Sequence, residues 1–194
     1  MKSLLAIDRR KLIIEAATKS FSLFGYKATT MDQIAKLANV GKGTIYTFFK
    51  NKEDLFYEII TSLLKEMKEA AEQFMHSDLP FHEKVDRTLY KLLEFRKEHQ
   101  LYIKLFQEES DIGTPEVQEV MLRIEESILN YIKNIILEAI QNGEIKECEP
   151  EITAFVILKL YISLIFDWEK HHEPLKKEEI SKLFKLYLFQ GLST

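Results

Sequence analysis

The sequence predicts an all-α protein. Its 194 residues include only 6 glycines and 4 prolines, so residues that interrupt helices are scarce. No long segment alternates between apolar and polar residues in the way that a half-buried strand does. Apolar residues instead recur at helical spacing, beginning with Ile13, Ala17 and Phe21. We therefore expect a helical protein whose first part is a small three-helix domain.

Cap residues set the limits of the first two helices. Asp8 is expected to cap a helix over residues 9–24, which Gly25 ends. Thr30, followed three residues later by Gln33, matches a capping box and opens the second helix. The side chains expected to face the core of this region are Ile13, Ala17, Phe21, Phe24, Ile34, Leu37 and Ala38.

A tight turn separates the second helix from the third. Asn39 tolerates the left-handed backbone conformation that such a turn needs. Gly41 is an acceptable N-cap for a third helix that runs to about Phe49. Two short helices joined in this way form a helix-turn-helix. Six more helical segments follow, a short one at residues 101–109 and longer ones at residues 52–74, 80–98, 115–141, 150–171 and 175–192.

Charge is unevenly distributed along the chain. Residues 1–52 contain ten lysines and arginines but three acidic residues, a net charge of +7. The other 17 basic and 28 acidic residues leave a net charge of −11 for the rest of the chain. The first part therefore suits a polyanion such as DNA, and the second does not. We predict a DNA-binding domain at residues 1–52 and a second domain with a different role at residues 53–194.

The third helix is expected to pack on one side and to meet DNA on the other. A helical wheel places Ile45 and Phe49 together on the packing side. Without a β-carbon, Gly43 lets the backbone approach a ligand closely. The exposed side offers groups suited to groove edges and phosphates, on Lys42, Thr44, Tyr46 and Thr47, with Lys50 and Lys52 following at the helix exit.

The order of residues from Ile13 to Phe56 resembles the N-terminal domain of the tetracycline-repressor (TetR) family. The marks of this resemblance lie in register over the whole segment. They are Ala16-Ala17, Phe21, Gly25-Tyr26, Thr29-Thr30, Ile34-Ala35, Val40, Gly43-Thr44, Tyr46, Phe49-Lys50 and Lys52-Glu53-Asp54-Leu55.

The resemblance implies a symmetric homodimer of about nine helices per subunit, which represses transcription at palindromic double-stranded DNA until a small-molecule effector releases it. It also implies that residues 53–194 form the effector-binding and dimerisation domain, and that Thr30, Tyr46 and Lys52 contact phosphates. Major-groove contacts would come from Lys42, Gly43, Thr44, Tyr46 and Thr47.

Three positions depart from the family pattern. The family usually has glycine where this chain has Asn39, and often a polar residue where it has Gly41. Phe48 replaces the usual histidine or tyrosine. The second and third differences each remove a possible phosphate contact. Phe48 would then pack against sugar, a thymine methyl or the domain itself.

The effector is expected to be apolar. Aromatic residues are frequent between Phe81 and Trp168, as in a cavity with apolar walls and a few polar groups. Such a lining suits a fatty acyl chain, its thioester or a lipophilic drug. The candidate pocket residues are Phe95, Arg96, His99, Tyr102, Phe106, Ile128 and Phe166.

The segment from Ile152 to Trp168 is apolar almost all round. Its 17 residues fall short of the ~20 that a membrane span needs, and Lys159 lies in the middle. We expect instead a helix that is covered on one side by its own domain and on the other by a second subunit. Together with residues 183–192 it would form the dimer interface, without any contact to a membrane.

No motif indicates an enzyme, a cofactor or a metal site. The sequence has no glycine-rich phosphate loop, nucleophile elbow or HExxH motif. Cys148 is the single cysteine, so no internal disulfide can form, and a redox role for it stays open. The apolar stretch Leu4–Ile7 is too short for a signal peptide, which predicts a cytoplasmic protein. The alternative function is a helical protein whose basic N-terminal part binds another anion or a membrane surface.

Overall fold

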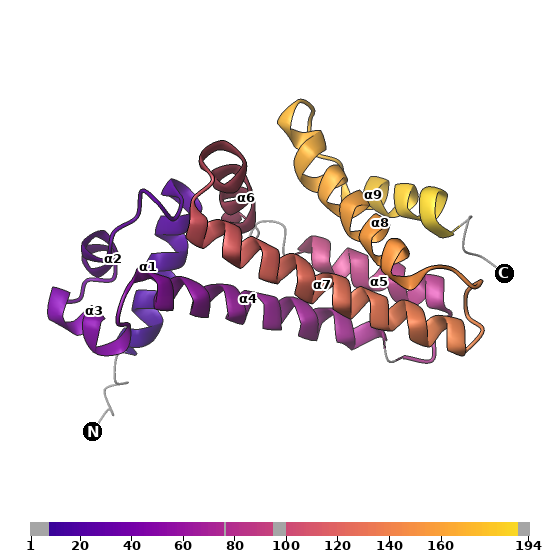
Figure 1. Cartoon of the computed structure of the whole chain (residues 1–194), viewed down its shortest axis with the longest axis horizontal. Coiled ribbons are helices and arrows are strands. Elements are labelled where there is room, and N and C mark those ends of the chain that lie inside the picture. Colours follow the sequence, from indigo (N-terminus) through magenta and orange to yellow (C-terminus); the bar gives the residue numbers. More distant parts are fainter. Residues whose placement is uncertain (1–7, 76, 95–99, 190–194) are drawn as a thin grey trace, which may run out of the picture. The chain divides into compact units, whose positions relative to one another are not determined.

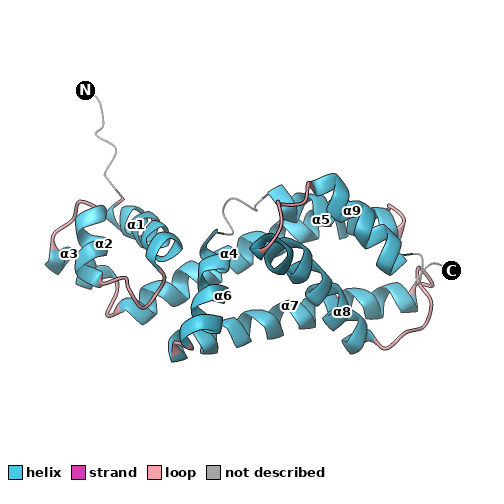
Figure 2. Cartoon of the chain, turned by 90° about the horizontal axis from the view of Figure 1, so that it is seen from above, coloured by secondary structure: helices cyan, strands magenta, loops and turns pink. Residues whose placement is uncertain are grey.

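The computed structural model describes residues 8–75, 77–94 and 100–189, and this part of the chain is helical (Figure 1). Colouring by secondary structure shows helices joined by loops, without strands in the described ranges (Figure 2). The helices are α1 (Arg9–Phe24), α2 (Met31–Leu37), α3 (Lys42–Phe48), α4 (Lys52–Met75), α5 (Phe81–Glu94), α6 (Gln100–Ile112), α7 (Pro115–Gln141), α8 (Pro150–Ile162) and α9 (Lys177–Phe184).

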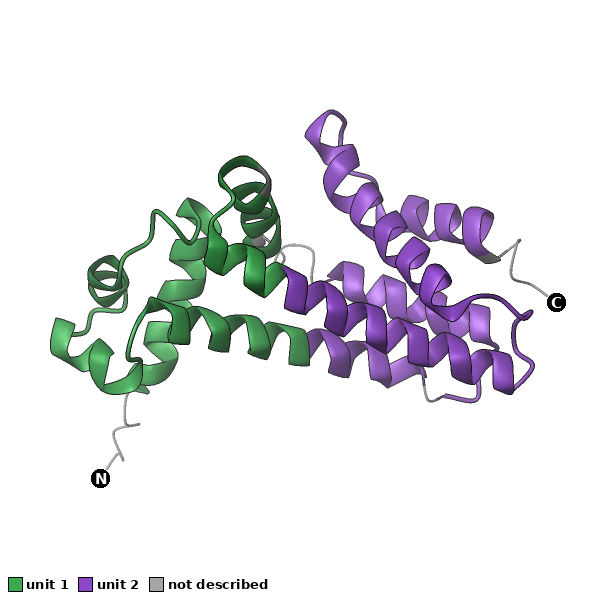
Figure 3. Cartoon of the chain, viewed as in Figure 1, with its two compact units in different colours: residues 1–65, 98–121 green, residues 66–97, 122–194 purple. Residues whose placement is uncertain are grey.

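The chain packs as two compact units (Figure 3). Unit 1 comprises residues 1–65 and 98–121, and unit 2 comprises residues 66–97 and 122–194. The division falls inside α4 and α7, each of which is one continuous helix. Unit 1 thus adds α6 and the start of α7 to the segment with the predicted helix-turn-helix. The predicted functional division after residue 52 stays a prediction.

Unit 1 is built on a core shared by α1, α2, α3 and α4. Ile13, Ile34 and Ile45 are fully buried, one from each of the first three helices. Phe21 and Phe56 meet edge to face at 5.4 Å between ring centroids. The ring of Tyr26 lies against both of these phenylalanines, so aromatic packing joins α1 to α4 and to the residues that follow α1.

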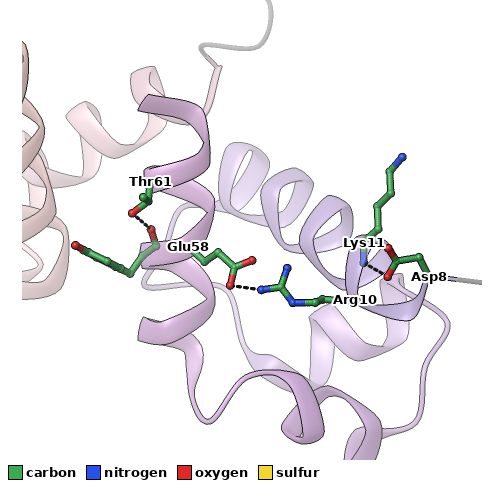
Figure 4. Close-up of polar contacts among 6 residues, drawn as sticks. Asp8, Arg10, Lys11, Glu58 and Thr61 are labelled. Atoms are coloured by element: carbon green, nitrogen blue, oxygen red, sulfur yellow. Dashed lines mark hydrogen bonds and ion pairs between the residues drawn. The ribbon is translucent and has the colours of Figure 1, made fainter. Parts of the chain in front are cut away.

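Polar contacts at the start of α1 complete its attachment to α4 (Figure 4). The carboxylate of Asp8 accepts a hydrogen bond from the backbone N–H of Lys11, which confirms the predicted N-cap. Arg10 donates to Glu58 of α4 at 2.5 Å. The pair is solvent-exposed and therefore contributes at most about 1 kcal/mol to stability.

Two expected core residues are exposed. Phe24 is 60% exposed because it is the last residue of α1, at the point where the chain turns away. Leu37 is 53% exposed, because the buried Ile34, Ala35 and Ala38 occupy an arc of about 100° around the helix and Leu37 lies about 60° outside that arc. The expectation that these side chains face inward was wrong for both.

Unit 2 has two apolar clusters. The first contains residues of α5 and α9, among them Leu93 and Phe184, together with Ile165. The second joins Phe81 at the start of α5 to Ile136 on α7. Partly buried side chains of α8 pack against both clusters.

The last two predicted helices begin near their expected residues, but their α-helical geometry ends earlier than expected. After α8 the chain continues as a π-helical turn over Ser163–Asp167 (η2) and a 3-10 turn over Trp168–Lys170 (η3). After α9 a π-helical turn covers Lys185–Phe189 (η4). No helix in the described ranges is long and apolar enough to cross a membrane.

Candidate nucleic-acid interface

The turn between α2 and α3 has the predicted conformation. Asn39 adopts a positive φ of 52°, which confirms its left-handed backbone. The N–H of Val40 donates to the carbonyl of Ala35 at 3.0 Å and closes the turn. The two helices of the helix-turn-helix are therefore held by backbone contacts as well as by their apolar sides.

The two sides of α3 differ as the helical wheel predicts. Ile45 is fully buried and Phe49 is 3% exposed, so both lie on the packing side. On the other side Lys42, Gly43, Tyr46 and Thr47 are exposed, and Thr44 is half-buried. Their predicted contacts with DNA stay a prediction, and the exposure leaves these groups accessible to a ligand.

Gly43 borders open space. Apart from its chain neighbours and the backbone of its own helix, a β-carbon added to Gly43 would meet no atom of the described residues within 4 Å. The fold of unit 1 therefore gives no reason for a glycine at this position. A closely approaching ligand does give one, because even a methyl group would keep a DNA backbone at a greater distance.

Lys42 already has a partner within the domain. Its Nζ donates to the carboxylate of Asp32 on α2 at 2.9 Å, and this carboxylate raises the pKa of the Lys42 ammonium. Both side chains are largely exposed, so the pair is weak and can exchange for a contact with DNA. The ammonium of Lys42 therefore keeps its positive charge and stays available to an anionic ligand.

The hydroxyls of Thr30 and Thr47 both make local hydrogen bonds. Thr30 caps α2 in the predicted capping box, in which its hydroxyl oxygen accepts from the N–H of Gln33. Thr47 donates to the carbonyl of Thr44, one turn earlier on α3. Both residues are exposed at the surface.

Lys50 and Lys52 have different surroundings. Lys50 is exposed. Lys52 is half-buried, and its ammonium donates to the carbonyls of Tyr26 and Thr29 at 2.9 and 3.1 Å. It also lies 4.0 Å from the centroid of the Tyr26 ring. The structure thus gives Lys52 a role inside unit 1 that the sequence did not predict, beside its predicted phosphate contact.

Phe48 is 41% exposed, which leaves its ring free to contact sugar or a thymine methyl. This exposure therefore disfavours the alternative that Phe48 packs within the domain.

The predicted effector residues are distributed over both units. Tyr102 and Phe106 lie on α6 in unit 1, whereas Ile128 and Phe166 lie in unit 2. Phe166 packs against the first apolar cluster of unit 2, as an ordinary core residue would. The candidates Phe95, Arg96 and His99 lie outside the described residues. The pocket as a whole stays a prediction.

Sequence reasoning missed a polar network around the residues that join α1 to α2. Glu108 on α6 is only 5% exposed, yet its carboxylate accepts hydrogen bonds from the backbone N–H groups of Tyr26 and Lys27. The hydroxyl of Tyr26 donates to Glu53, and burial together with Glu53 raises the pKa of this hydroxyl. In the sequence, Glu108 stands in the polar run QEES and carries no signal that separates it from a surface glutamate.

No group of three or more histidine, cysteine, aspartate or glutamate side chains within the described ranges is arranged to hold a metal ion. Cys148 is half-buried beside the second apolar cluster of unit 2.

Family models match both parts of the chain. The model described as "Bacterial regulatory proteins, tetR family" matches residues 13–59. The model described as "Tetracyclin repressor-like, C-terminal domain" matches residues 78–192.

Individual relatives agree with this assignment. The chain is 66% identical over 189 residues to the uncharacterized HTH-type transcriptional regulator YhgD of Bacillus subtilis, covering 97% of this chain and 99% of the relative. It is 32% identical over 136 residues to the fatty acid metabolism regulator protein of B. subtilis, covering 70% of each. A crystal structure of the transcriptional regulator FadR from B. subtilis in complex with stearoyl-CoA superposes with a TM-score of 0.74 at 26% identity, over 90% of this chain and 96% of that one. This protein therefore belongs to the TetR family of bacterial transcriptional regulators, which bind DNA through a helix-turn-helix.

Proposed function

We propose that this protein is a homodimeric repressor that binds a palindromic operator and leaves it when a long-chain fatty acyl thioester binds. The exposed side of α3 carries the DNA-binding part of the proposal. It combines an ammonium, hydroxyl groups and an open approach at Gly43. As a regulator of transcription it would act in the cytoplasm.

The effector class rests on a relative rather than on a pocket of this chain. The B. subtilis FadR structure at 26% identity contains stearoyl-CoA, and a second similarity is to a fatty acid metabolism regulator. The many apolar residues of unit 2 are consistent with an apolar ligand, and the candidates for its polar end are Arg96 and His99, which lie outside the described residues. A palindromic operator would place the two α3 helices about 34–36 Å apart, one turn of DNA.

The test begins with an operator selected from random duplexes by the purified protein. We expect binding in the range of 10⁻⁸ to 10⁻¹¹ M that is typical of specific sites. If about three or four phosphates are contacted per subunit, log K should fall with log salt with a slope of about −5 to −7. Equal affinity for a scrambled duplex would instead support the alternative of a general anion-binding protein.

Stearoyl-CoA is then titrated against the protein–operator complex. An effector that weakens operator binding about 100-fold needs about 2.7 kcal/mol of differential affinity, and DNA must weaken effector binding by the same factor. Coenzyme A alone, acetyl-CoA and a nonionic detergent of similar chain length are the controls. Release by the detergent would indicate denaturation, and release by coenzyme A or acetyl-CoA would contradict an effector recognised by its long apolar chain.

A further inference from the structure

The α1–α2 turn (residues 25–29) is hydrogen-bonded to one buried carboxylate on α6. Oε2 of Glu108 accepts from the N–H of Tyr26 at 2.6 Å, and Oε1 accepts from the N–H of Lys27 at 2.9 Å. The hydroxyl of Thr114, just before α7, donates to Oε1 at 2.8 Å. All of these residues belong to unit 1.

A buried carboxylate of this kind fixes the position of its partners. Removing a carboxylate from water is costly unless hydrogen bonds replace its hydration, and here three donors do so. Two of the three are backbone groups, which cannot rotate away as a side chain can. The α1–α2 turn must therefore keep its position relative to α6 for Glu108 to remain satisfied.

The same turn is bonded to the start of α4. The ammonium of Lys52 donates to the carbonyls of Tyr26 and Thr29, and the hydroxyl of Tyr26 donates to Glu53. Within the turn, the hydroxyl of Thr29 donates to the carbonyl of Gly25 at 2.8 Å. Hydrogen bonds from α6 and from α4 thus determine where the α1–α2 turn lies.

The position of the turn sets the position of the helix-turn-helix. Thr30, the residue directly after the turn, is the N-cap of α2. α2 is joined to α3 by the tight turn at Asn39, so a displacement at the start of α2 also displaces α3. A specific contact with bases is sensitive to such a shift, because hydrogen-bond geometry tolerates only a few tenths of an ångström.

We propose that Glu108 is a positioning residue for DNA recognition, which fixes the helix-turn-helix relative to α6 through the backbone of the α1–α2 turn. The proposal rests on DNA binding and does not depend on the identity of the effector. It gives α6 a polar connection to the DNA-binding helices through the α1–α2 turn, which the aromatic packing among Phe21, Tyr26 and Phe56 does not provide.

The experiment compares Glu108→Gln with Asp111→Asn, and all measurements are made without an effector. Both substitutions remove one negative charge from α6, but Asp111 is exposed. A glutamine offers only one acceptor oxygen, so one of the two backbone N–H groups loses its bond. For each variant we measure the affinity for the selected operator and for a scrambled duplex, well below the melting temperature.

We expect Glu108→Gln to bind the operator about tenfold more weakly, the size of one lost charge-assisted hydrogen bond, and to bind the scrambled duplex as before. Binding to scrambled DNA depends on charge and not on base contacts. Asp111→Asn should keep the wild-type ratio of the two affinities. The amides of Tyr26 and Lys27 should exchange their hydrogens faster in Glu108→Gln than in Asp111→Asn.

A purely structural role for Glu108 would lower the melting temperature and leave the ratio unchanged, and this result would overturn the proposal. If Glu108→Gln does not fold, Thr114→Val decides, because it removes only the third donor and keeps the side-chain shape. A loss of about two- to threefold in the ratio supports the proposal, and an unchanged ratio overturns it. Failure of stearoyl-CoA to release DNA would leave these measurements unaffected.

Discussion

Glu108 leaves no room for a side chain at Gly25. A β-carbon at Gly25 would overlap with Oε2 of Glu108, and Gly25 also has a positive φ of 84°. The glycine therefore serves two purposes: it ends α1 in a conformation that other residues avoid, and it lets the carboxylate reach the backbone of the α1–α2 turn.

Gly25→Ala should lower the free energy of unfolding by about 2–3 kcal/mol, since both the backbone strain and the displaced carboxylate oppose the substitution. Chemical denaturation monitored by circular dichroism measures this change. A loss below about 1 kcal/mol would mean that Glu108 can move away at little cost, which would also weaken the positioning role proposed for it.

Gly43→Ala should have the opposite effect on stability. A β-carbon at Gly43 meets open space, and alanine is the better helix former by about 1 kcal/mol. We expect a protein that is more stable by about 0.5–1 kcal/mol but binds its operator roughly tenfold more weakly. The two quantities are measured by denaturation and by titration of a labelled duplex. Unchanged affinity would show that DNA does not approach the backbone at Gly43.

Lys50 and Lys52 form a matched pair of cations that should separate DNA binding from stability. Lys50→Met should leave stability within about 0.5 kcal/mol and flatten the salt dependence by about one unit per lost phosphate contact, two per dimer. Lys52→Met should cost about 1–3 kcal/mol of stability, because the carbonyls of Tyr26 and Thr29 lose their donor. If Lys52→Met changes only the salt dependence, its bonds to these carbonyls do not stabilise the domain.

The sequence was sufficient to predict the local features of unit 1. Asp8, Thr30 and Asn39 were identified as caps or turn residues because capping and left-handed conformations depend on the residue itself and its close neighbours. The same holds for the packing side of α3, where Ile45 and Phe49 follow from helical periodicity alone.

Contacts between distant segments could not be predicted in this way. Glu108 lies 82 residues after Tyr26 in the chain, and nothing in the residues around Glu108 marks it as buried. The internal bonds of Lys52 were missed for a related reason, since a lysine after a DNA-binding helix has the same local pattern whether it faces solvent or a carbonyl. The exposure of Phe24 depends on which element lies beside it, and helical spacing does not contain that information.

Tyr131 on α7 predicts a pH dependence of stability in unit 2. Its hydroxyl is buried without a hydrogen-bond partner among the described residues. Burial, with a smaller contribution from Glu72, raises the pKa of Tyr131 to about 12. Between about pH 10 and pH 12 the unfolded chain loses this proton while the folded protein keeps it, so stability falls as the pH rises through this window.

Tyr131→Phe should remove this part of the pH dependence. At neutral pH the variant should be more stable by about 1 kcal/mol, because an unsatisfied hydroxyl is lost. Its advantage over the wild type should grow above pH 10, as measured by urea denaturation at pH 8 and pH 11. All other ionisable groups are common to both proteins, so a constant difference would show that Tyr131 ionises in the folded state as readily as in the unfolded one.

The apolar faces of α8 and η4 predict where two subunits meet. Ile152 and Phe155 of α8 are 63% and 47% exposed, and Tyr187 of η4 is 62% exposed. Ile152→Asp should convert the dimer to a monomer at micromolar concentration, since it places a charge on the exposed apolar surface of the proposed interface. Leu122→Asp is the control, because Leu122 on α7 is 60% exposed and outside the predicted interface. Both substitutions replace exposed side chains, so each monomer should fold, and light scattering gives the mass.

A monomeric Ile152→Asp should also lose operator affinity, because one subunit contacts only half of a palindrome. If Leu122→Asp dissociates the dimer and Ile152→Asp does not, the interface lies on α7, and the assignment to α8 and η4 is wrong.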